Sequence, residues 1–475
     1  MLMREEQDSI GSKKVPKDAY YGIQSARAAE NFKITDLKVH PELIKNLAIV
    51  KKAAAEVNKK VGVLNERIAS SIIQAADEVI NGSLKDQFII DAVQGGAGTS
   101  INMNINEVLA NRAIEIMGGK KGDYSVVHPN NHVNMGQSTN DVVPTAVRMA
   151  VINLLREALS ELGKFEKALL EKSKEFDDVI KMGRTQLQDA VPIRLGQEFK
   201  AYANAVKRDI RRITETIDDL RVVNLGATAV GTGLNADLSY VRNVTSQLNK
   251  ISGLDLKQAE DLIDATQNVD ALVEVSSAMK TCAVNLSKIS NDLRLLSSGP
   301  RTGFNEINLP AVQPGSSIMP GKVNPVIPEV VNQISFQIIG NDTTITMAAE
   351  AGQLELNVMA PILIFNLIQS IEMLKNGVKT FTEKCIKGIT ANRERCKSLV
   401  DSSVGIITAI NPHVGYETAA RIAKEALSTE KSVKDIILEQ GILSEEELEE
   451  ILNPFEMTEP GIAGKNLLNC EESEL

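Results

Sequence analysis

Residues 195–220 of the chain read LGQEFKAYANAVKRDIRRITETIDDL and place apolar side chains at steps of three or four residues. The apolar positions are Leu195, Phe199, Tyr202, Val206, Ile210, Ile213, Ile217 and Leu220. Such steps align the apolar side chains along one side of a helix, whereas a half-buried strand needs strict alternation. The stretch therefore predicts a long amphipathic helix that packs against other helices.

A longer uninterrupted stretch follows, because the 45 residues between Gly253 and Gly299 include neither glycine nor proline. At ~1.5 Å per residue, a helix over all of 254–298 would be about 60 Å long. Helices of that length indicate a coiled coil, a membrane span or a large bundle, and the charges of Asp261, Asp270 and Glu274 exclude the membrane. Similar stretches occupy 145–162, 329–339 and 362–376. The predicted fold class is mainly α, a bundle of long helices.

These patterns divide the chain into three predicted domains. Residues 1–138 mix short helices with glycine-rich turns and form an N-terminal mixed helical domain. Residues 139–395 carry the long helices and form the central bundle. Residues 396–475 form a small C-terminal helical domain, with a helix over 416–427 and a second helix capped by Ser444 and Glu447 in a capping box.

Composition excludes several classes of protein. The 475 residues include 52 basic and 62 acidic side chains, for a net charge of −10, whereas nucleic acid or an anionic membrane calls for a basic face. The N-terminal residues MLMREEQDSI lack the apolar core of a signal peptide, and no stretch approaches the ~18 apolar residues of a membrane span. We expect a cytoplasmic protein that does not bind nucleic acid or membranes.

Four cysteines lie far apart, without a C-x-x-C pair: Cys282, Cys385, Cys396 and Cys470. This spacing disfavours a disulfide framework or a cysteine zinc site. We expect free thiols in a reducing compartment.

Four polar segments interrupt the helical pattern: 95–100 (GGAGTS), 128–141 (HPNNHVNMGQSTND), 183–189 (GRTQLQD) and 313–325 (QPGSSIMPGKVNP). All are rich in neutral hydrogen-bond donors. Only Arg184 and Lys322 add fixed positive charge. Asp141 and Asp189 are interpreted as structural caps or as groups that support the site residues, and not as catalytic acids. Taken singly, each segment is also typical of ordinary helix caps and turns.

The last segment does not match the phosphate-binding loop. Gly315 and Gly321 are separated by five residues in place of four, and Val323 occupies the position of the metal-binding hydroxyl. His128 and His132 are four residues apart, but Pro129 indicates a turn there, so a metal pair is not favoured. We predict no metal site.

Proton removal next to a carboxylate suits these residue types. The resulting carbanion is an aci-carboxylate with two negative charges on one carboxyl group, and several preorganised donors are needed to stabilise it. A serine can act as the base if backbone N–H groups and a nearby cation stabilise its alkoxide. The pair Ser316–Ser317, flanked by glycine and followed by Lys322, could supply both.

Residues 315–325 resemble the signature loop of the aspartase/fumarase superfamily of lyases. The resemblance extends over nearly the whole chain, through segments 18–22 (DAYYG), 30–32 (ENF), 104–107 (NINE), 228–235 (TAVGTGLN) and 411–416 (NPHVGY). Within the superfamily, His132, Ser138–Thr139, Gln313 and the segment 326–329 resemble the aspartase branch. Class II fumarases tend to have an acidic residue near position 132 and a Ser-Ser pair. Gln186 stands where fumarases, and some aspartases, have histidine.

The resemblance implies elimination of ammonia from L-aspartate, a small dicarboxylate, to give fumarate; the alternative is class II fumarate hydratase. It implies a homotetramer around a central multi-helix core, with each active site shared by three chains. An independent expectation agrees, since a helix over 254–298 has more apolar surface than one protomer covers. A non-enzymatic assembly, like the lens crystallins of this superfamily, is disfavoured because the loop keeps Ser316, Lys322 and Asn324.

Residue roles follow from the resemblance alone. Ser316 is the expected base. Ser317, Thr99, Ser138 and Thr139 would bind the β-carboxylate, Lys322, Asn324 and Thr185 the α-carboxylate, and Asn140 and Gln186 the amino group. His128 corresponds to a second anion site or to a turn-capping histidine. Neither an organic cofactor nor a metal is expected for bond cleavage, although Mg²⁺ activates some aspartases at a separate site.

Overall fold

The computed structural model describes residues 2–429 and 431–468. These residues are mainly α-helical, as predicted, and their strands pair into small two-stranded sheets. The chain forms two compact units. Unit 1 comprises residues 1–160, 209–283 and 334–376, and unit 2 comprises 161–208, 284–333 and 377–475. The division into 1–138, 139–395 and 396–475 remains a prediction.

Unit 1 begins with a hairpin of β1 (Met3–Asp8) and β2 (Gly11–Pro16), which the sequence analysis did not predict. Helices α2 (Pro41–Lys60), α3 (Glu66–Ile80) and α4 (Thr99–Ile116) follow, and α3 packs against both of the others. The shorter elements of this unit are α1 (Ile23–Asn31), η1 (Lys85–Gln87), η2 (Pro129–Val133), α7 (Ile217–Leu220), β5 (Val222–Val223), α8 (Leu238–Ser252), β6 (Lys257–Gln258) and α9 (Asp264–Gln267).

Local chemistry explains where these helices start. At α2, the Nδ1 atom of His40 accepts a hydrogen bond from the backbone N–H of Glu42, and Pro41 occupies the first helical turn. At α3, Asn65 caps the helix by accepting from the backbone N–H groups of Arg67 and Ile68.

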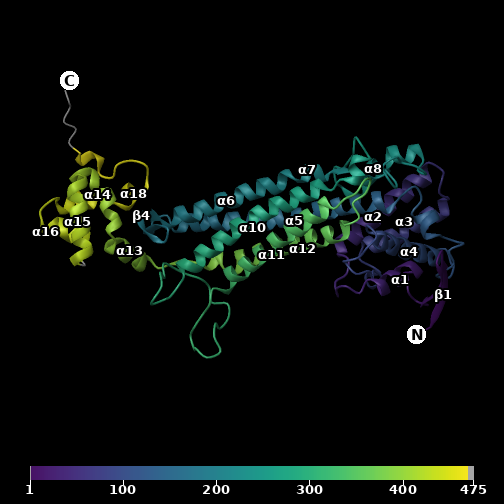
Figure 1. Ribbon diagram of the computed structural model, residues 1–475, viewed down its shortest axis with the longest axis horizontal. Helices are drawn as coiled ribbons and strands as arrows, with labels where there is room; N and C mark the ends of the chain where they lie inside the picture. Colours follow the sequence, from purple (N-terminus) through teal and green to yellow (C-terminus); the bar gives the residue numbers. More distant parts are fainter. Residues whose placement is uncertain (1, 430, 469–475) are drawn as a thin grey trace, which may run out of the picture. The chain divides into compact units, whose positions relative to one another are not determined.

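Five long helices, labelled in Figure 1, have residues in both units: α5 (Thr139–Glu175), α6 (Leu195–Glu215), α10 (Asp270–Leu296), α11 (Val326–Glu350) and α12 (Ala360–Lys384). In unit 1, Asp342 of α11 accepts hydrogen bonds from Ser276 Oγ (2.7 Å) and Lys280 Nζ (2.6 Å) of α10. Asn341 of α11 donates to Ser370 Oγ of α12 at 2.9 Å. These bonds join the faces of the bundle helices.

The predicted helix over 254–298 is shorter than expected. Residues 257–258 form β6, which pairs in parallel with β5, and the long helix α10 spans only Asp270–Leu296. Asp261 Oδ1 accepts from the backbone N–H groups of Ile263 and Asp264 and so closes a turn. An aspartate that bonds its own following backbone competes with helix formation even where glycine and proline are missing.

Unit 2 contains the helix predicted from 195–220 as α6 (Leu195–Glu215), most of whose residues lie in this unit. Leu195, Phe199 and Val206 of its apolar stripe are fully buried, as predicted. Tyr202 donates to Asp292 of α10 at 2.9 Å. Strands β3 (Ile180–Thr185) and β4 (Gln188–Arg194) form an antiparallel hairpin just before α6.

The C-terminal part of unit 2 is helical, as predicted. The helix expected over 416–427 is α15 (Tyr416–Thr429). Ser444 and Glu447 make the predicted capping box at α17 (Glu445–Ile451). The remaining elements are β7 (Ile307–Asn308), η3 (Ile386–Gly388), β8 (Thr390–Ala391), α13 (Arg393–Ser402), η4 (Val404–Ile406), α14 (Ile407–Val414), α16 (Val433–Glu439), α18 (Pro454–Thr458) and η5 (Lys465–Leu467).

Three of the four cysteines, Cys282, Cys385 and Cys396, are free, as predicted, and all three are buried; Cys470 lies outside the described residues. Burial raises the pKa of the Cys385 and Cys396 thiols to about 12. None of the helices in the described part of the chain is both long and apolar enough to cross a membrane.

Candidate active site

The start of α5 carries three predicted substrate-binding residues, Ser138, Thr139 and Asn140. The backbone N–H of Asn140 donates to Ser138 Oγ at 3.2 Å, and the Asn140 side-chain amide donates to the carbonyl of Ala229 at 2.7 Å. Because the Ser138 oxygen accepts a bond from the protein, its O–H remains available to a ligand. The Asn140 Oδ1 atom likewise remains available as an acceptor.

Asp141 lies beneath this helix start and is fully buried. Its Oδ1 atom accepts from the backbone N–H of Ser138 at 2.9 Å, and its Oδ2 atom accepts from those of Gly226 (3.1 Å) and Thr228 (3.2 Å). Burial raises the pKa of this carboxyl group to about 6, while the three backbone bonds oppose the shift. Its predicted capping role is confirmed by these bonds.

Thr99 is the first residue of α4, and this helix start closely approaches that of α5. Gly98, at a φ of +92°, immediately precedes it, and a Cβ atom there would lie 3.2 Å from Cγ1 of Val143. Asn102, one turn further along α4, donates to Thr139 Oγ1 at 3.1 Å. The structure therefore brings four predicted residues of unit 1 to two adjoining helix starts: Thr99, Ser138, Thr139 and Asn140.

In unit 2, Thr185 and Gln186 lie at the exposed end of the β3–β4 hairpin. Thr185 pairs with Gln188, and the two residues between them, Gln186 and Leu187, have φ values of +55° and +61°. Two consecutive left-handed residues make the tight turn that matches the twist of paired strands. This turn holds the Gln186 side chain at the tip of the hairpin.

A buried ionic cluster holds the hairpin to the rest of unit 2. Arg184 donates to Glu306 at 2.8 Å, and the Lys181 ammonium lies 3.4 Å from the same carboxylate. Lys181 also donates to Glu198 at 2.9 Å. Burial raises the pKa of Glu198, and the adjacent ammonium opposes that shift. The cluster fixes the strand that leads directly into Thr185.

The loop between β7 and α11 holds the predicted base. Ser316 Oγ accepts hydrogen bonds from the backbone N–H groups of Ile318 (3.2 Å) and Met319 (3.1 Å). Ser316 is partly exposed. Two main-chain donors therefore point at its oxygen, which is the arrangement that stabilises negative charge there.

Two hydrogen bonds join the two ends of the same loop. The backbone N–H of Gly315 donates to the carbonyl of Lys322, and the Asn324 side-chain amide donates to the carbonyl of Gly315, both at 2.8 Å. A Cβ at position 315 would lie 2.7 Å from the Lys322 carbonyl oxygen, so only glycine fits. Ser317 and Lys322 are exposed on the closed loop.

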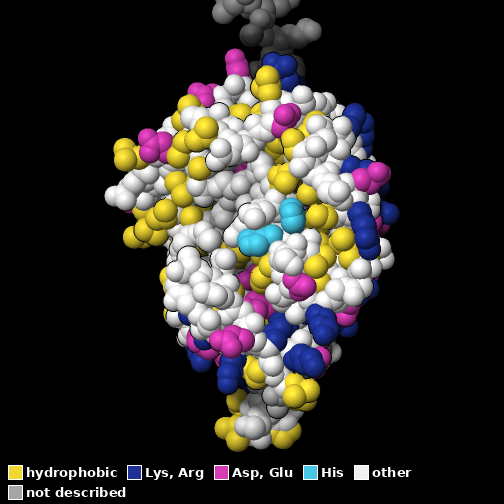
Figure 2. Space-filling model, turned by 90° about the vertical axis from the view of Figure 1, so that its right-hand side faces the viewer, with side chains coloured by type: hydrophobic (Ala, Val, Ile, Leu, Met, Phe, Trp, Pro, Cys, Tyr) yellow, Lys and Arg dark blue, Asp and Glu magenta, His cyan; other side chains and the backbone are white. Residues whose placement is uncertain are grey.

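His128 caps a short π-helix, η2, where the sequence analysis predicted a turn. Its Nδ1 atom accepts from the backbone N–H groups of Asn130 and Asn131, which leaves the Nε2 nitrogen to carry the ring proton. Burial lowers its pKa, so the ring is neutral at pH 7. The capping role is confirmed, and the second anion site remains a prediction. Figure 2 shows a pair of histidine side chains near the middle of one face, among mostly uncharged neighbours.

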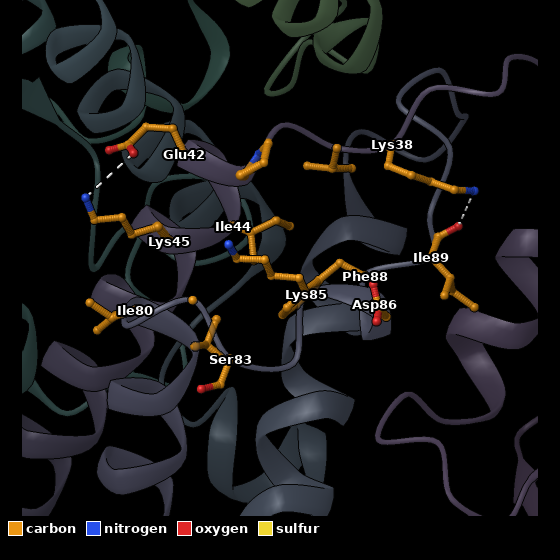
Figure 3. Close-up of a pocket in the computed structure, with 14 residues that line it drawn as sticks. Lys38, Glu42, Ile44, Lys45, Ile80, Ser83, Lys85, Asp86, Phe88 and Ile89 are labelled. Atoms are coloured by element: carbon orange, nitrogen blue, oxygen red, sulfur yellow. Dashed lines mark hydrogen bonds and ion pairs between the residues drawn. The ribbon is translucent and has the colours of Figure 1, made fainter.

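A separate cavity of about 600 Å³ in unit 1 lies between α2, the end of α3 and the segment that leads to α4. Lys45 lies 3.6 Å from Glu42 on one side, and Lys38 donates to the carbonyl of Ile89 on the other (Figure 3). This cavity includes none of the predicted site residues. Among the described residues, no group of three or more His, Cys, Asp or Glu side chains is arranged to hold a metal ion.

Comparison with known proteins shows which family the chain resembles. A family model described as lyase matches residues 11–340, and one described as fumarase C C-terminus matches 406–459. A relative from Bacillus sp, named aspartate ammonia-lyase, is 61% identical over 98% of this chain and 99% of its own.

The chain belongs to the aspartase/fumarase superfamily of lyases.

Two solved structures of this superfamily resemble nearly the whole chain. One, a fumarate lyase:delta crystallin from Brucella melitensis, has a TM-score of 0.94 and 50% identity, and the match covers 97% of this chain and 100% of that one. The other, a class II fumarase from Schistosoma mansoni, has a TM-score of 0.92 and 37% identity with the same coverage. The resemblance found in the sequence is confirmed.

Three residues near the superfamily's motifs were missed in the sequence analysis: Lys51, Asn102 and Glu306. Each is buried and polar, with exposed fractions of 0%, 2% and 0%. A lysine in an alanine-rich helix and an asparagine in the repeat NMNIN follow no motif that predicts their burial. The nearest signal was the recurrence of asparagine at positions 102, 104 and 106 in a segment that is otherwise apolar.

Proposed function

We propose that this chain catalyses the reversible elimination of ammonia from L-aspartate, which gives fumarate. The observation that carries the proposal is the Ser316 loop, in which two backbone N–H groups face the oxygen of the expected base. The substrate assignment is supported by the Bacillus relative, which is named for this reaction and aligns over nearly the full length of both chains.

In the proposed mechanism, the Ser316 alkoxide removes a proton from C3 of L-aspartate. The electron pair of the C–H bond moves into the adjacent β-carboxylate and forms the aci-carboxylate. Collapse of that species makes the C2–C3 double bond and breaks the C2–N bond, so ammonia leaves. The backbone N–H groups of Ile318 and Met319 stabilise the alkoxide before the reaction, and Lys322 on the same loop adds positive charge.

Ser317, Thr99, Ser138 and Thr139 would bind the β-carboxylate, where the second negative charge develops. Hydroxyl oxygens that already accept bonds from the protein, as those of Ser138 and Thr139 do, present their hydrogens to this group. Such donors act more strongly on the intermediate than on the substrate, and this difference lowers the barrier.

Lys322, Asn324 and Thr185 would bind the α-carboxylate. The Asn324 Nδ2 atom already donates one hydrogen to the Gly315 carbonyl and so closes the loop. Asn324 would therefore both hold the loop groups in place and contact the carboxylate. The free Oδ1 atom of Asn140 and the exposed amide of Gln186 would accept hydrogen bonds from the substrate ammonium. Glutamine does not exchange protons, so Gln186 orients the leaving group without protonating it.

We propose further that four chains assemble and that each active site draws on three of them. Large apolar side chains on α11 support assembly, since Phe336 is 62% exposed and Met347 63% exposed in the single chain. The free thiols of Cys282, Cys385 and Cys396 are consistent with a cytoplasmic location. Mass measurement of the native protein tests the assembly, with four chains expected.

Fumarate absorbance after mixing the purified protein with L-aspartate or L-malate tests the reaction. We expect fumarate from L-aspartate and none from L-malate, with no added organic cofactor. Turnover of malate but not of aspartate would identify a class II fumarate hydratase. Assays with and without Mg²⁺ would show whether a separate activating site exists.

A further inference from the structure

A fully buried lysine lies behind the predicted β-carboxylate site in unit 1. Lys51 of α2 donates to Asn134 Oδ1 at 2.8 Å and to Gln137 Oε1 at 2.9 Å. Burial lowers the pKa of its ammonium group to about 7, and the charge of Asp141 opposes the shift. A neutral amine keeps two N–H groups, so Lys51 can make both bonds in either protonation state.

Lys51 and the backbone carbonyl of Gln137 together determine which way the Asn134 amide faces. Lys51 donates to the amide oxygen, and a carbonyl can only accept, so the NH₂ group of Asn134 must face Gln137. The Asn134 Nδ2 atom then donates to the backbone carbonyl of Gln137 at 3.1 Å. The same Oδ1 atom accepts from the side-chain amides of Asn102 (3.1 Å) and Asn106 (3.2 Å) of α4.

Asn102 is oriented in turn. Because the Asn134 oxygen only accepts, Asn102 must present its NH₂ group, and a flipped amide would place two oxygens face to face. The same Nδ2 nitrogen lies 3.1 Å from Thr139 Oγ1. One hydrogen of the NH₂ group serves Asn134 and the other serves Thr139.

We propose that Asn102 is a positioning residue that makes the Thr139 hydroxyl a donor to the substrate's β-carboxylate. Lys51 and the Gln137 carbonyl set this direction through Asn134. The inference rests on the proposed function, in which Thr139 binds that carboxylate. A hydroxyl can donate or accept, and the bond from Asn102 occupies its oxygen so that its hydrogen points to the ligand.

The direction of the Thr139 hydrogen bond matters because the negative charge on the β-carboxylate increases from one to two when the aci-carboxylate forms. A donor already aimed at that oxygen does not need to reorganise during the reaction. Loss of such an interaction lowers kcat together with kcat/KM, whereas loss of uniform binding raises KM alone. Asn102 variants are therefore expected to change kcat.

Asn106 provides a matched control. It lies one turn from Asn102 on α4, is also buried, and donates to the same Asn134 oxygen, but no bond joins it to Thr139. We expect Asn102→Ala to lower kcat for aspartate elimination by about 10-fold or more, which is less than the roughly 10²–10³ for outright loss of a donor because the Thr139 hydroxyl itself remains. Asn106→Ala should leave kcat within about 3-fold, since the bonds it loses, to Asn134 Oδ1 and to Met103 Sδ, do not involve Thr139. Equal losses of kcat in both variants would overturn the inference.

A double-mutant cycle tests whether Asn102 acts through Thr139. In a Thr139→Val background there is no hydroxyl to orient, so adding Asn102→Ala should lower kcat by less than about 3-fold. Independent, multiplying losses would overturn the inference. Wild-type protein without aspartate elimination would contradict the proposed function itself, which is a different result.

Asn102→Asp provides a second variant of nearly the same size if the alanine variant fails to fold. A carboxylate at position 102 accepts a bond from Thr139 and withdraws the hydroxyl from the substrate. We expect a loss of kcat at least as large as that predicted for Asn102→Ala, with KM changed less than kcat. Normal kcat in a folded Asn102→Asp variant would overturn the inference.

Discussion

The Oγ atom of Ser316 lies 3.1 Å from the backbone nitrogen of Met319, and the backbone N–H of Ile318 donates to the same oxygen. A serine hydroxyl is a weak base unless its alkoxide is stabilised, and these two main-chain groups are present before any substrate binds. The bond between the Gly315 N–H and the Lys322 carbonyl closes the loop around them.

Ser316→Ala removes the proposed base and leaves the loop closure intact. We expect the rate of aspartate elimination to fall by about 10²–10⁴, the range for losing a general base. Circular dichroism and native mass should match the wild type. Ser428→Ala, at an exposed serine of α15 that bonds only the Glu425 carbonyl, is a matched control with unchanged activity. Activity of Ser316→Ala within about tenfold of wild type would contradict the base assignment.

Gln186→Gly separates the backbone role of this residue from its side-chain role. Its φ of +55° strains a residue that has a Cβ atom but does not strain glycine, so the variant should be at least as stable toward unfolding as the wild type. The amide contact to the substrate ammonium is lost, so kcat/KM should fall by about 10-fold or more. Steady-state kinetics on L-aspartate measures the change.

Leu187→Gly is the control for that variant, because Leu187 has the same kind of backbone conformation and a side chain that is 66% exposed. Leu187→Gly should keep kcat/KM within about 3-fold of the wild-type value. Its effect on the free energy of unfolding should be similar to that of Gln186→Gly. Equal activity of the two glycine variants would show that Gln186 does not contact the substrate.

The spacing of apolar residues correctly predicted those bundle helices whose formation depends on that spacing alone. The stripe from Leu195 to Leu220 became α6, followed by the short helix α7. The same approach was wrong for the start of 254–298, because Asp261 closes a turn with its own backbone and residues 257–258 pair with β5. Counting glycine and proline does not detect such side-chain competition.

Sequence motifs predicted which loops hold the proposed catalytic and binding residues. They did not predict the buried polar residues that support those loops. Ser316 and Lys322 lie on an exposed loop whose glycines are visible in the sequence. Lys51 and Glu306 became recognisable only through burial, since lysine and glutamate are ordinarily surface residues. Their positions depend on which helices pack together, and a local pattern does not record that.

Glu306→Gln tests the buried cluster that supports the β3–β4 hairpin. The substitution leaves Lys181 and Arg184 without their shared carboxylate, and breaking a buried ion pair in this way typically costs about 3–5 kcal/mol. We expect a large fall in the urea midpoint. Glu383→Gln, which removes an exposed pair with Lys387, should leave the midpoint unchanged. A midpoint for Glu306→Gln equal to that of the control would show that the cluster does not stabilise unit 2.

Lys51→Met tests the buried ammonium through its pH dependence. The pKa of Lys51 is about 7 in the folded chain and 10.5 in an unfolded one. Between these values the unfolded state binds more protons, so this residue makes the folded state more stable as pH rises. The wild-type free energy of unfolding, minus that of Lys51→Met, should therefore increase from pH 7 to pH 10 at fixed protein concentration.

Lys52→Met provides the comparison, because Lys52 is partly exposed and bonds Asp77 at 2.7 Å. This variant shows how much of the difference comes from removing any lysine of α2. Urea unfolding at several pH values measures both differences. If the difference for Lys51→Met is flat or falls as pH rises, the Lys51 ammonium is not destabilised by burial. In that case Lys51 would remain charged beneath Asn134 throughout the pH range of the assay.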